Sequence, residues 1–179
     1  FGYSVSISSD GTTAIVGAYQ DGDNGLYSGA SYISSLVGGV WEDNELLARD
    51  GACTDRFGYS VSISSDGTTA IVGARYDDDN GLYSGSAYIY CFDETAWIET
   101  KLLASDGAST DDFGYMVSIS SDGTSAIVGA VYDDDNGYNS GSAYIYSLVK
   151  GIWQETKLAA SDGASEDFFG HSVSISGDG

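Results

Sequence analysis

The sequence contains no proline, one histidine and two cysteines, and it has only six lysine and arginine residues against 27 aspartate and glutamate residues. The resulting net charge of −21 argues against nucleic-acid partners and anionic membrane surfaces, because both need cationic side chains to neutralise phosphate. The charge favours multivalent cations, or it simply reflects an acidic surface suited to a salty or extracellular setting. We therefore expect no nucleic-acid partner and no membrane insertion in these residues.

Other absences narrow the chemistry further. No Asn-X-Ser/Thr sequon occurs, so N-linked glycans are not expected, whereas O-linked glycans on serine and threonine stay open. No segment has the 3.6-residue apolar period of a helix, and none has the setting of a phosphate-binding loop. The absence of proline fits strands in which the backbone N–H groups are all hydrogen bonded.

A 56-residue repeat dominates what is present. The segment FGYSVSISSDGTTAIVGA occurs at 1–18 and unchanged at 57–74, and it returns with two changes at 113–130. Such units stack and bury their apolar faces on their neighbours. We expect the chain to be a window of a longer array, divided into repeats 1–56, 57–112 and 113–168 and the start of a fourth at 169–179.

Each repeat is expected to contain four antiparallel strands. In the second repeat, apolar residues alternate with serine over 59–63, which predicts one strand, and the apolar run 68–74 predicts a strand buried on both faces. The segments 86–92 and 97–104 predict the third and fourth strands. The predicted fold class is therefore all-β, with tandem four-stranded antiparallel blades of the β-propeller type.

Two dipeptides mark every repeat. Each unit opens with Phe-Gly and closes its second strand with Gly-Ala, at Phe1-Gly2, Phe57-Gly58, Phe113-Gly114, Gly17-Ala18, Gly73-Ala74 and Gly129-Ala130. In these residues the chain resembles the FG-GAP repeat family, which is best known from the head of integrin α subunits and is abundant in secreted microbial and algal proteins. The resemblance implies a β-propeller, an extracellular or cell-surface location and a role in adhesion.

The chain departs from the family's pattern in two places. Tyr19, Arg75 and Val131 replace the proline that follows Gly-Ala. The family's calcium loop lies between the first two strands, where this chain has only a tight turn, so that metal site is not carried over residue by residue. In this respect the chain is closer to a shorter FG-GAP subtype in which the acidic residues follow Gly-Ala.

The acidic cluster after Gly-Ala is the candidate metal site. Carboxylates at alternate positions, followed by an amide and a glycine, can wrap oxygen ligands around calcium, which is the predicted cofactor. The alternative is an exposed turn in which Asp and Asn cap their own backbone. The nine candidate ligands are Asp21, Asp23, Asn24, Asp77, Asp79, Asn80, Asp133, Asp135 and Asn136.

A second acidic set precedes each Phe-Gly, at Asp50 and Asp55, Asp106 and Asp111, and Asp162 and Asp167. This spacing can hold a cation between units, but we favour an ordinary turn. Cys53 and Cys91 replace serines of the other copies. A disulfide between units and two free thiols both stay open.

Nothing in the repeats predicts catalysis. Acid–base catalysis needs unlike environments within one cleft, whereas these acids recur identically in each copy. The only histidine, His171, takes the place of Tyr3 and is interpreted as a strand substitution. The regularly spaced aromatic residues can stack on carbohydrate, although packing between blades explains them better: Tyr27, Tyr83, Trp41, Trp97 and Trp153.

The predicted function is a non-catalytic extracellular structural or adhesive module, supported by calcium. Its expected partners are copies of itself, another extracellular protein or a glycan. Near-identity of the copies favours a surface filament, because equivalent contacts along an axis need equivalent surfaces. A closed ring of about four to eight blades is the competing architecture. The alternative function is a closed propeller of a secreted carbohydrate-binding protein or enzyme whose active loops lie outside these residues.

Overall fold

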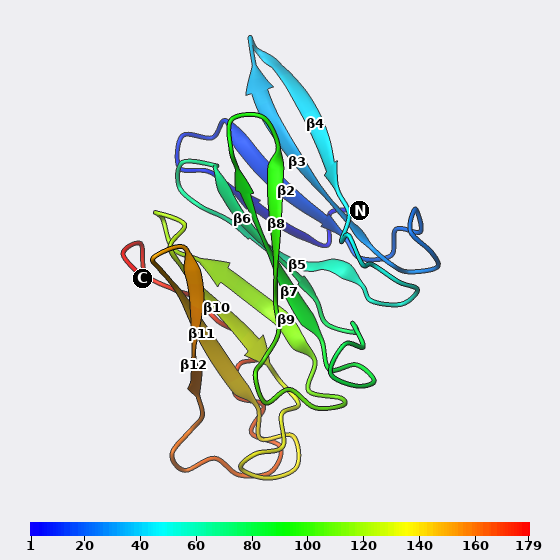
Figure 1. The fold of residues 1–179 in the computed structure, drawn as a ribbon, viewed down its shortest axis with the longest axis vertical. Coiled ribbons are helices and arrows are strands. Elements are labelled where there is room, and N and C mark those ends of the chain that lie inside the picture. Colours follow the sequence, from blue (N-terminus) through cyan, green and yellow to red (C-terminus); the bar gives the residue numbers. More distant parts are fainter.

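The computed structural model describes residues 1–179 and consists of three four-stranded antiparallel sheets, here termed blades 1 to 3 (Figure 1). Blade 1 contains β1 (Ser4–Ile7), β2 (Thr13–Ala18), β3 (Ala30–Val37) and β4 (Val40–Leu46). Blade 2 contains β5 (Phe57–Ile63), β6 (Thr69–Ala74), β7 (Ser86–Phe92) and β8 (Trp97–Leu102). Blade 3 contains β9 (Phe113–Ile119), β10 (Ser125–Ala130), β11 (Ser142–Val149) and β12 (Ile152–Leu158).

Within each blade the strand order follows the chain, so each strand pairs with the next one in the sequence. The all-β prediction with four strands per unit is confirmed, and the blades do not close into a ring within these residues. β6 is buried on both faces, as its apolar run predicted. β8 ends two residues before the expected end, at Leu102, where the chain leaves the sheet. The chain forms no helix long and apolar enough to cross a membrane.

The apolar core lies in the gaps between blades, one cluster in each gap. Phe57 is 1% exposed and packs edge-on against Tyr88 and Tyr90 of its own blade, with ring centroids 5.3 and 6.1 Å apart. Phe113 repeats this arrangement one blade further along, with Tyr144 and Tyr146. Each blade therefore depends on a neighbour to cover its core.

The Phe-Gly and Gly-Ala motifs meet across the gap between blades. Gly114, with φ +88°, places its carbonyl oxygen so close to Gly73 that a Cβ on Gly73 would overlap it. The same contact joins Gly17 to Gly58 and Gly129 to Gly170. The two dipeptides are thus the two sides of one backbone contact, which explains why they recur with one period.

Serine hydroxyls of β1 and β5 accept hydrogen bonds from the first strand of the next blade. Ser4 Oγ accepts from the Val61 N–H at 3.0 Å, and Ser60 Oγ accepts from the Val117 N–H at 3.0 Å. β5 pairs only with β6, and β9 only with β10, so these amides lie on strand edges that no other strand covers. The serines therefore supply hydrogen-bond acceptors to backbone amides that no neighbouring strand pairs with. Met116 occupies this serine position in blade 3.

The two ends of the array differ. Residues 169–179 form no strand, but Phe169 makes a parallel bridge to Gly141, as Phe57 does to Gly29. In blade 1, the first-strand face that other blades bury is open to solvent, with Phe1, Val5 and Ile7 all exposed.

Candidate functional site

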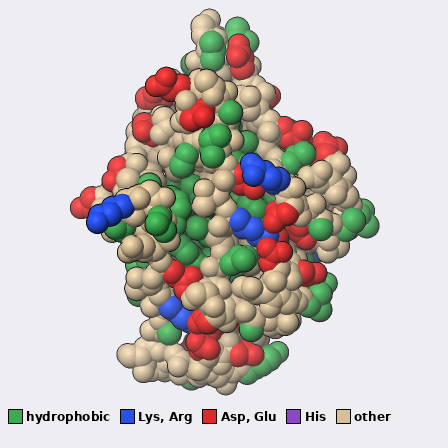
Figure 2. All heavy atoms as spheres, in the orientation of Figure 1, with side chains coloured by type: hydrophobic (Ala, Val, Ile, Leu, Met, Phe, Trp, Pro, Cys, Tyr) green, Lys and Arg blue, Asp and Glu red, His purple; other side chains and the backbone are tan.

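The acidic loops of blades 2 and 3 each close around a lysine ammonium. Lys101 on β8 places Nζ 2.8 Å from Asp50, 3.0 Å from Asp77 and 2.7 Å from Asp79, measured to Oδ2 of each carboxylate. In blade 3, Lys157 repeats the cluster at 2.7 Å from Asp106, 2.8 Å from Asp133 and 2.6 Å from Asp135. On the face drawn in Figure 2, the few basic side chains lie beside acidic ones. The sequence analysis missed both lysines.

The buried acid of the blade 2 cluster is fully partnered. The Asp77 side chain is 4% exposed, and its Oδ1 accepts a hydrogen bond from the Asp79 N–H at 3.2 Å. Its Oδ2 lies 2.9 Å from the hydroxyl of Tyr88, which also lies 3.0 Å from Asp50. Burial opposes the charge on Lys101, but hydrogen bonds to the three carboxylates raise its pKa above the ordinary value. The cluster thus stabilises an ammonium inside an acidic loop.

Blade 1 has the same acidic loop without a lysine. Glu45 occupies the position of Lys101, and the Tyr32 hydroxyl donates to Glu45 Oε1 at 2.8 Å and lies 3.3 Å from Asp21 Oδ2. The Asp23 N–H donates to Asp21 Oδ1 at 3.1 Å. This backbone cap recurs in the other two copies, so the turn interpretation describes part of each loop.

The asparagines of the predicted sites tie each loop to the linker beside it. Nδ2 of Asn24, Asn80 and Asn136 donates to the carbonyl oxygen of Ala48, Ala104 and Ala160 at 3.4, 3.1 and 3.1 Å, respectively. The structure therefore brings the two alternate aspartates of blades 2 and 3 together around a lysine and directs the amide nitrogens toward the backbone. The structure shows no group of three or more His, Cys, Asp or Glu side chains already arranged as metal ligands.

The linker aspartates divide into two roles. Asp50 pairs with Lys101. Burial acts to raise the pKa of Asp50, but the hydrogen bond from Lys101 outweighs it and the pKa is lowered. Asp55 instead caps a turn by accepting the Ala52 N–H at 2.6 Å. Burial raises the pKa of Asp55 to about 6, and the nearby acidic loop adds to the rise. Asp106 and Asp111 repeat the two roles, so the favoured turn is present at Asp55 and Asp111, whereas Asp50 and Asp106 pair with a lysine and a bound cation between units stays a prediction.

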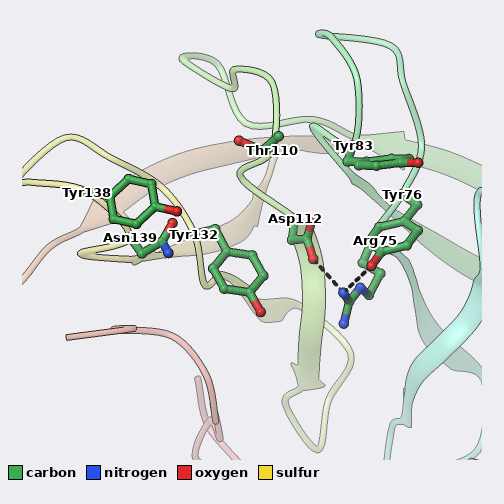
Figure 3. A pocket seen from close by; sticks show the side chains of 8 residues that line it. All are labelled: Arg75, Tyr76, Tyr83, Thr110, Asp112, Tyr132, Tyr138 and Asn139. Atoms are coloured by element: carbon green, nitrogen blue, oxygen red, sulfur yellow. Dashed lines mark hydrogen bonds and ion pairs between the residues drawn. The ribbon is translucent and has the colours of Figure 1, made fainter. Parts of the chain in front are cut away.

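A second site, built from arginine and tyrosine, lies between the loops that follow β6 and β10 (Figure 3). The guanidinium of Arg75 lies 4.4 Å from the ring centroid of Tyr76 and 4.7 Å from that of Tyr59. Its Nη2 lies 3.0 Å from Asp112 Oδ2 and donates to the Tyr76 hydroxyl at 2.7 Å. Burial raises the pKa of Asp112 to about 7, and Arg75 and Arg56 oppose the rise. Sequence reasoning did not identify this cluster.

The structure also places the cysteines, tryptophans and histidine that the sequence singled out. Cys53 and Cys91 are free, exposed thiols. Trp97 and Trp153 pack against the clusters between blades, as predicted, whereas Trp41 is 47% exposed. The imidazole Nε2 of His171 lies 3.4 Å from the Tyr115 hydroxyl and extends a row of tyrosines, although residue 171 is not in a strand.

Comparison with known proteins gives a family and a distant structural likeness. A sequence model described as FG-GAP repeat matches residues 1–34, 41–90, 97–146 and 153–179. No curated protein matches the chain. Among solved structures, the chain is similar to a hypothetical selenium-binding protein from Sulfolobus tokodaii, with a TM-score of 0.48 and 12% identity over 83% of this chain and 39% of that one. The chain therefore spans less than half of the length of that structure.

Proposed function

Because the chain belongs to the FG-GAP repeat family, a structural and non-enzymatic kind of repeat typical of extracellular proteins, we propose that it is a non-catalytic structural or adhesive module of a cell-surface or secreted protein. The observation that carries the proposal is an interface between blades that is built twice from the same contacts. Its residues also appear, uncovered, on the open face of blade 1.

The difference in exposure on that face is large. Phe1, Val5 and Ile7 are 86, 66 and 60% exposed, whereas their counterparts one repeat later are 1, 6 and 7% exposed: Phe57, Val61 and Ile63. A further blade, from the same chain or from a second copy, can therefore cover the open face with contacts that already join blades 1 and 2. Head-to-tail addition of copies closes into a ring or extends into a filament, depending on the rotation between units.

Light scattering on the 179-residue chain tests self-association. A discrete small oligomer would support a ring, and growing mass would support a filament. The variant Val5→Asp should reduce either form, because it places a charge where a blade must pack. Val40→Asp is the matched control, because Val40 is 64% exposed but lies on the outer strand β4. A monomeric wild type, or equal effects of the two variants, would remove self-association from the proposal.

Calcium support is part of the same proposal, with blade 1 the best candidate. There Asp21, Asp23 and Asn24 follow Gly-Ala, and Glu45 replaces the lysine that fills the acidic clusters of the other blades. In blades 2 and 3 an ion at the predicted ligands would have to displace Lys101 or Lys157. Weak sites, with affinities of about 0.1–1 mM, would add about 0.4–1.4 kcal/mol each at millimolar calcium.

Thermal unfolding with millimolar calcium and with chelator tests this assignment. Calcium should raise the melting temperature of the wild type and raise that of Glu45→Lys less, because the lysine then competes for the same carboxylates. This variant carries the residue found in the other two copies, so its fold should be retained. No calcium-dependent shift in either protein would exclude calcium support.

A further inference from the structure

The arginine–tyrosine cavity between blades 2 and 3 has the features of a ligand site, and we propose that it binds a neutral saccharide. Its volume is about 340 Å³, within the range of small-molecule sites, and aromatic rings and a few polar groups form its walls. The lining residues are Arg75, Tyr76, Tyr83, Thr110, Asp112, Tyr132, Tyr138 and Asn139 (Figure 3). The proposal does not depend on self-association or on calcium, because neither the open face of blade 1 nor the acidic clusters contribute to the cavity.

The cavity is formed by residues at which the three copies differ. Aligned at the 56-residue period, the copies are not identical at 25 positions, and all six repeat positions that line the cavity are among them. Arg75 and Asp112, which form the ion pair in its wall, occupy two of the five positions that carry a different residue in every copy. Stacking of equivalent blades would favour equivalent residues, so this variation indicates a single site that breaks the repeat symmetry.

Three residues that line the cavity have left-handed backbone conformations. Tyr83, Asp112 and Asn139 have φ values of 56°, 55° and 54°, in the left-handed region that glycine adopts with less strain. The equivalent positions in the other copies also hold residues other than glycine, including Tyr27 and Arg56. The left-handed backbone therefore belongs to the loops of every copy, and what distinguishes the cavity is the set of side chains that these loops present.

Arg75 provides a polar anchor for a ligand. Its side chain is 10% exposed, and its guanidinium forms the ion pair with Asp112 and the hydrogen bond to Tyr76. Its Nε is buried and has no hydrogen-bond partner. A buried N–H group without an acceptor is unfavourable, so a ligand oxygen would gain an interaction with it if the Arg75 side chain turned to expose the nitrogen to the cavity.

The surroundings select a neutral, hydroxyl-rich ligand. A cationic ligand is disfavoured because Arg75 already covers one face of Tyr76, at 4.4 Å. An anionic ligand would approach Asp112 in a chain of net charge −21. Arg75 and Tyr83 both cover the ring of Tyr76, and the two tyrosine rings stack with centroids 4.4 Å apart. Tyr83 and Tyr132 are therefore the rings that remain to stack on the C–H face of a sugar. The planar groups of Arg75 and Asn139 can bond to its hydroxyls.

Saturation-transfer NMR on the 179-residue chain, with glucose, galactose, mannose, cellobiose and lactose as probes, tests the proposal. At least one sugar should bind, with a dissociation constant of about 1–10 mM. The variant Tyr83→Ala should weaken binding about tenfold or more. Tyr27→Ala is the matched control, because Tyr27 has the same repeat position and a φ of 57° but lies outside the cavity.

A second variant guards against loss of fold. The double variant Arg75→Val/Asp112→Phe introduces the pair that blade 3 carries at these positions, Val131 and Phe168, so that no buried carboxylate loses its counter-charge. It should abolish binding while the far-UV spectrum stays unchanged. Binding of none of the five sugars would overturn the proposal. Equal losses of binding from Tyr83→Ala and Tyr27→Ala would also overturn it. The same holds if glycine betaine or sulfate binds in place of the sugars and this binding depends on Tyr83.

Discussion

The ammonium group of Lys101 lies 3.0 Å from Oδ2 of Asp77, so a carboxylate predicted to bind a metal ion has a cation from its own blade. The lysine belongs to the fourth strand, and the aspartate to the loop after the second. The Lys101 ammonium also pairs with Asp50, which lies in the linker that precedes the blade. One side chain therefore fastens together three segments that the acidic residues would otherwise push apart.

Replacing Lys101 by methionine should lower the free energy of unfolding by about 2–4 kcal/mol, because Asp77 would be left buried without its counter-charge. Urea denaturation of the variant and the wild type measures the difference. Lys150→Met is the control, because Lys150 lies in the exposed turn between β11 and β12. Similar losses in the two variants would mean that the cluster does not stabilise the blade.

Replacing Gly73 by alanine should be among the most damaging single changes, with a loss of about 3 kcal/mol or more. The new Cβ would overlap the backbone carbonyl of Gly114, which cannot move without separating blades 2 and 3. Gly22→Ala should cost little, because the Cβ meets nothing closer than 3.7 Å and the other copies carry aspartate there. Thermal unfolding of both variants tests the contrast, and a mild effect of Gly73→Ala would contradict the observed contact.

Replacing Ser60 by alanine should cost about 1–3 kcal/mol. The Val117 N–H donates to the Ser60 hydroxyl at 3.0 Å in a buried position, and the change leaves that donor without an acceptor. The exposed hydroxyl of Ser9 donates only to that of Ser65, at 2.9 Å, so Ser9→Ala should change stability by less than about 0.5 kcal/mol. Equilibrium unfolding should separate the two serines; equal values would show that the bond between blades contributes nothing.

Stability should fall as the pH rises from about 4 to 7. Burial raises the pKa of Asp112 to about 7, from an ordinary value near 3.8, and that of Asp55 and Asp111 to about 6. The folded state therefore binds more protons than the unfolded state in this window, and the stabilisation present at low pH is lost as these groups ionise. Asp112 alone contributes at most about 4 kcal/mol to this difference.

The variant Asp112→Asn tests this assignment by urea denaturation between pH 4.5 and 7.5. Its stability should depend less on pH than that of the wild type, above all between about pH 5 and 6.5, where Asp112 is protonated in the folded state and ionised in the unfolded state. Asp93→Asn should leave this slope unchanged, because its hydrogen bonds from Thr95 and Ala96 lower the pKa of Asp93 and place its effect at lower pH. A wild type that becomes more stable from pH 5 to 7 would show that other groups dominate.

The strands could be predicted because their signals are local. The alternation in β5 and the apolar run of β6 each lie within one short segment. The same patterns recur every 56 residues, so each copy supports the prediction again. The contact of Gly73 with Gly114 was not predicted, because it joins residues of adjacent repeats. The motifs were visible in the sequence, but the reason for them appears only when two blades are packed together.

The two sites were less predictable for the same reason. Lys101 is 24 residues from Asp77 and 51 from Asp50, and within β8 it resembles an ordinary solvent-facing lysine. A signal was nevertheless present, because two copies have lysine at this position and the first has Glu45. Arg75 stood out as a replacement for the family's proline, but its meaning depends on Asp112, which is contributed by the end of the next linker.

The contact between Phe-Gly and Gly-Ala has a consequence for how the array unfolds. Each repeat supplies one half of this contact to the repeat before it and the other half to the repeat after it. A lone repeat would then hold two halves and no complete contact, and the number of complete contacts would be one fewer than the number of repeats. Unfolding should therefore become more cooperative, and melting temperatures should rise toward a plateau, as copies are added.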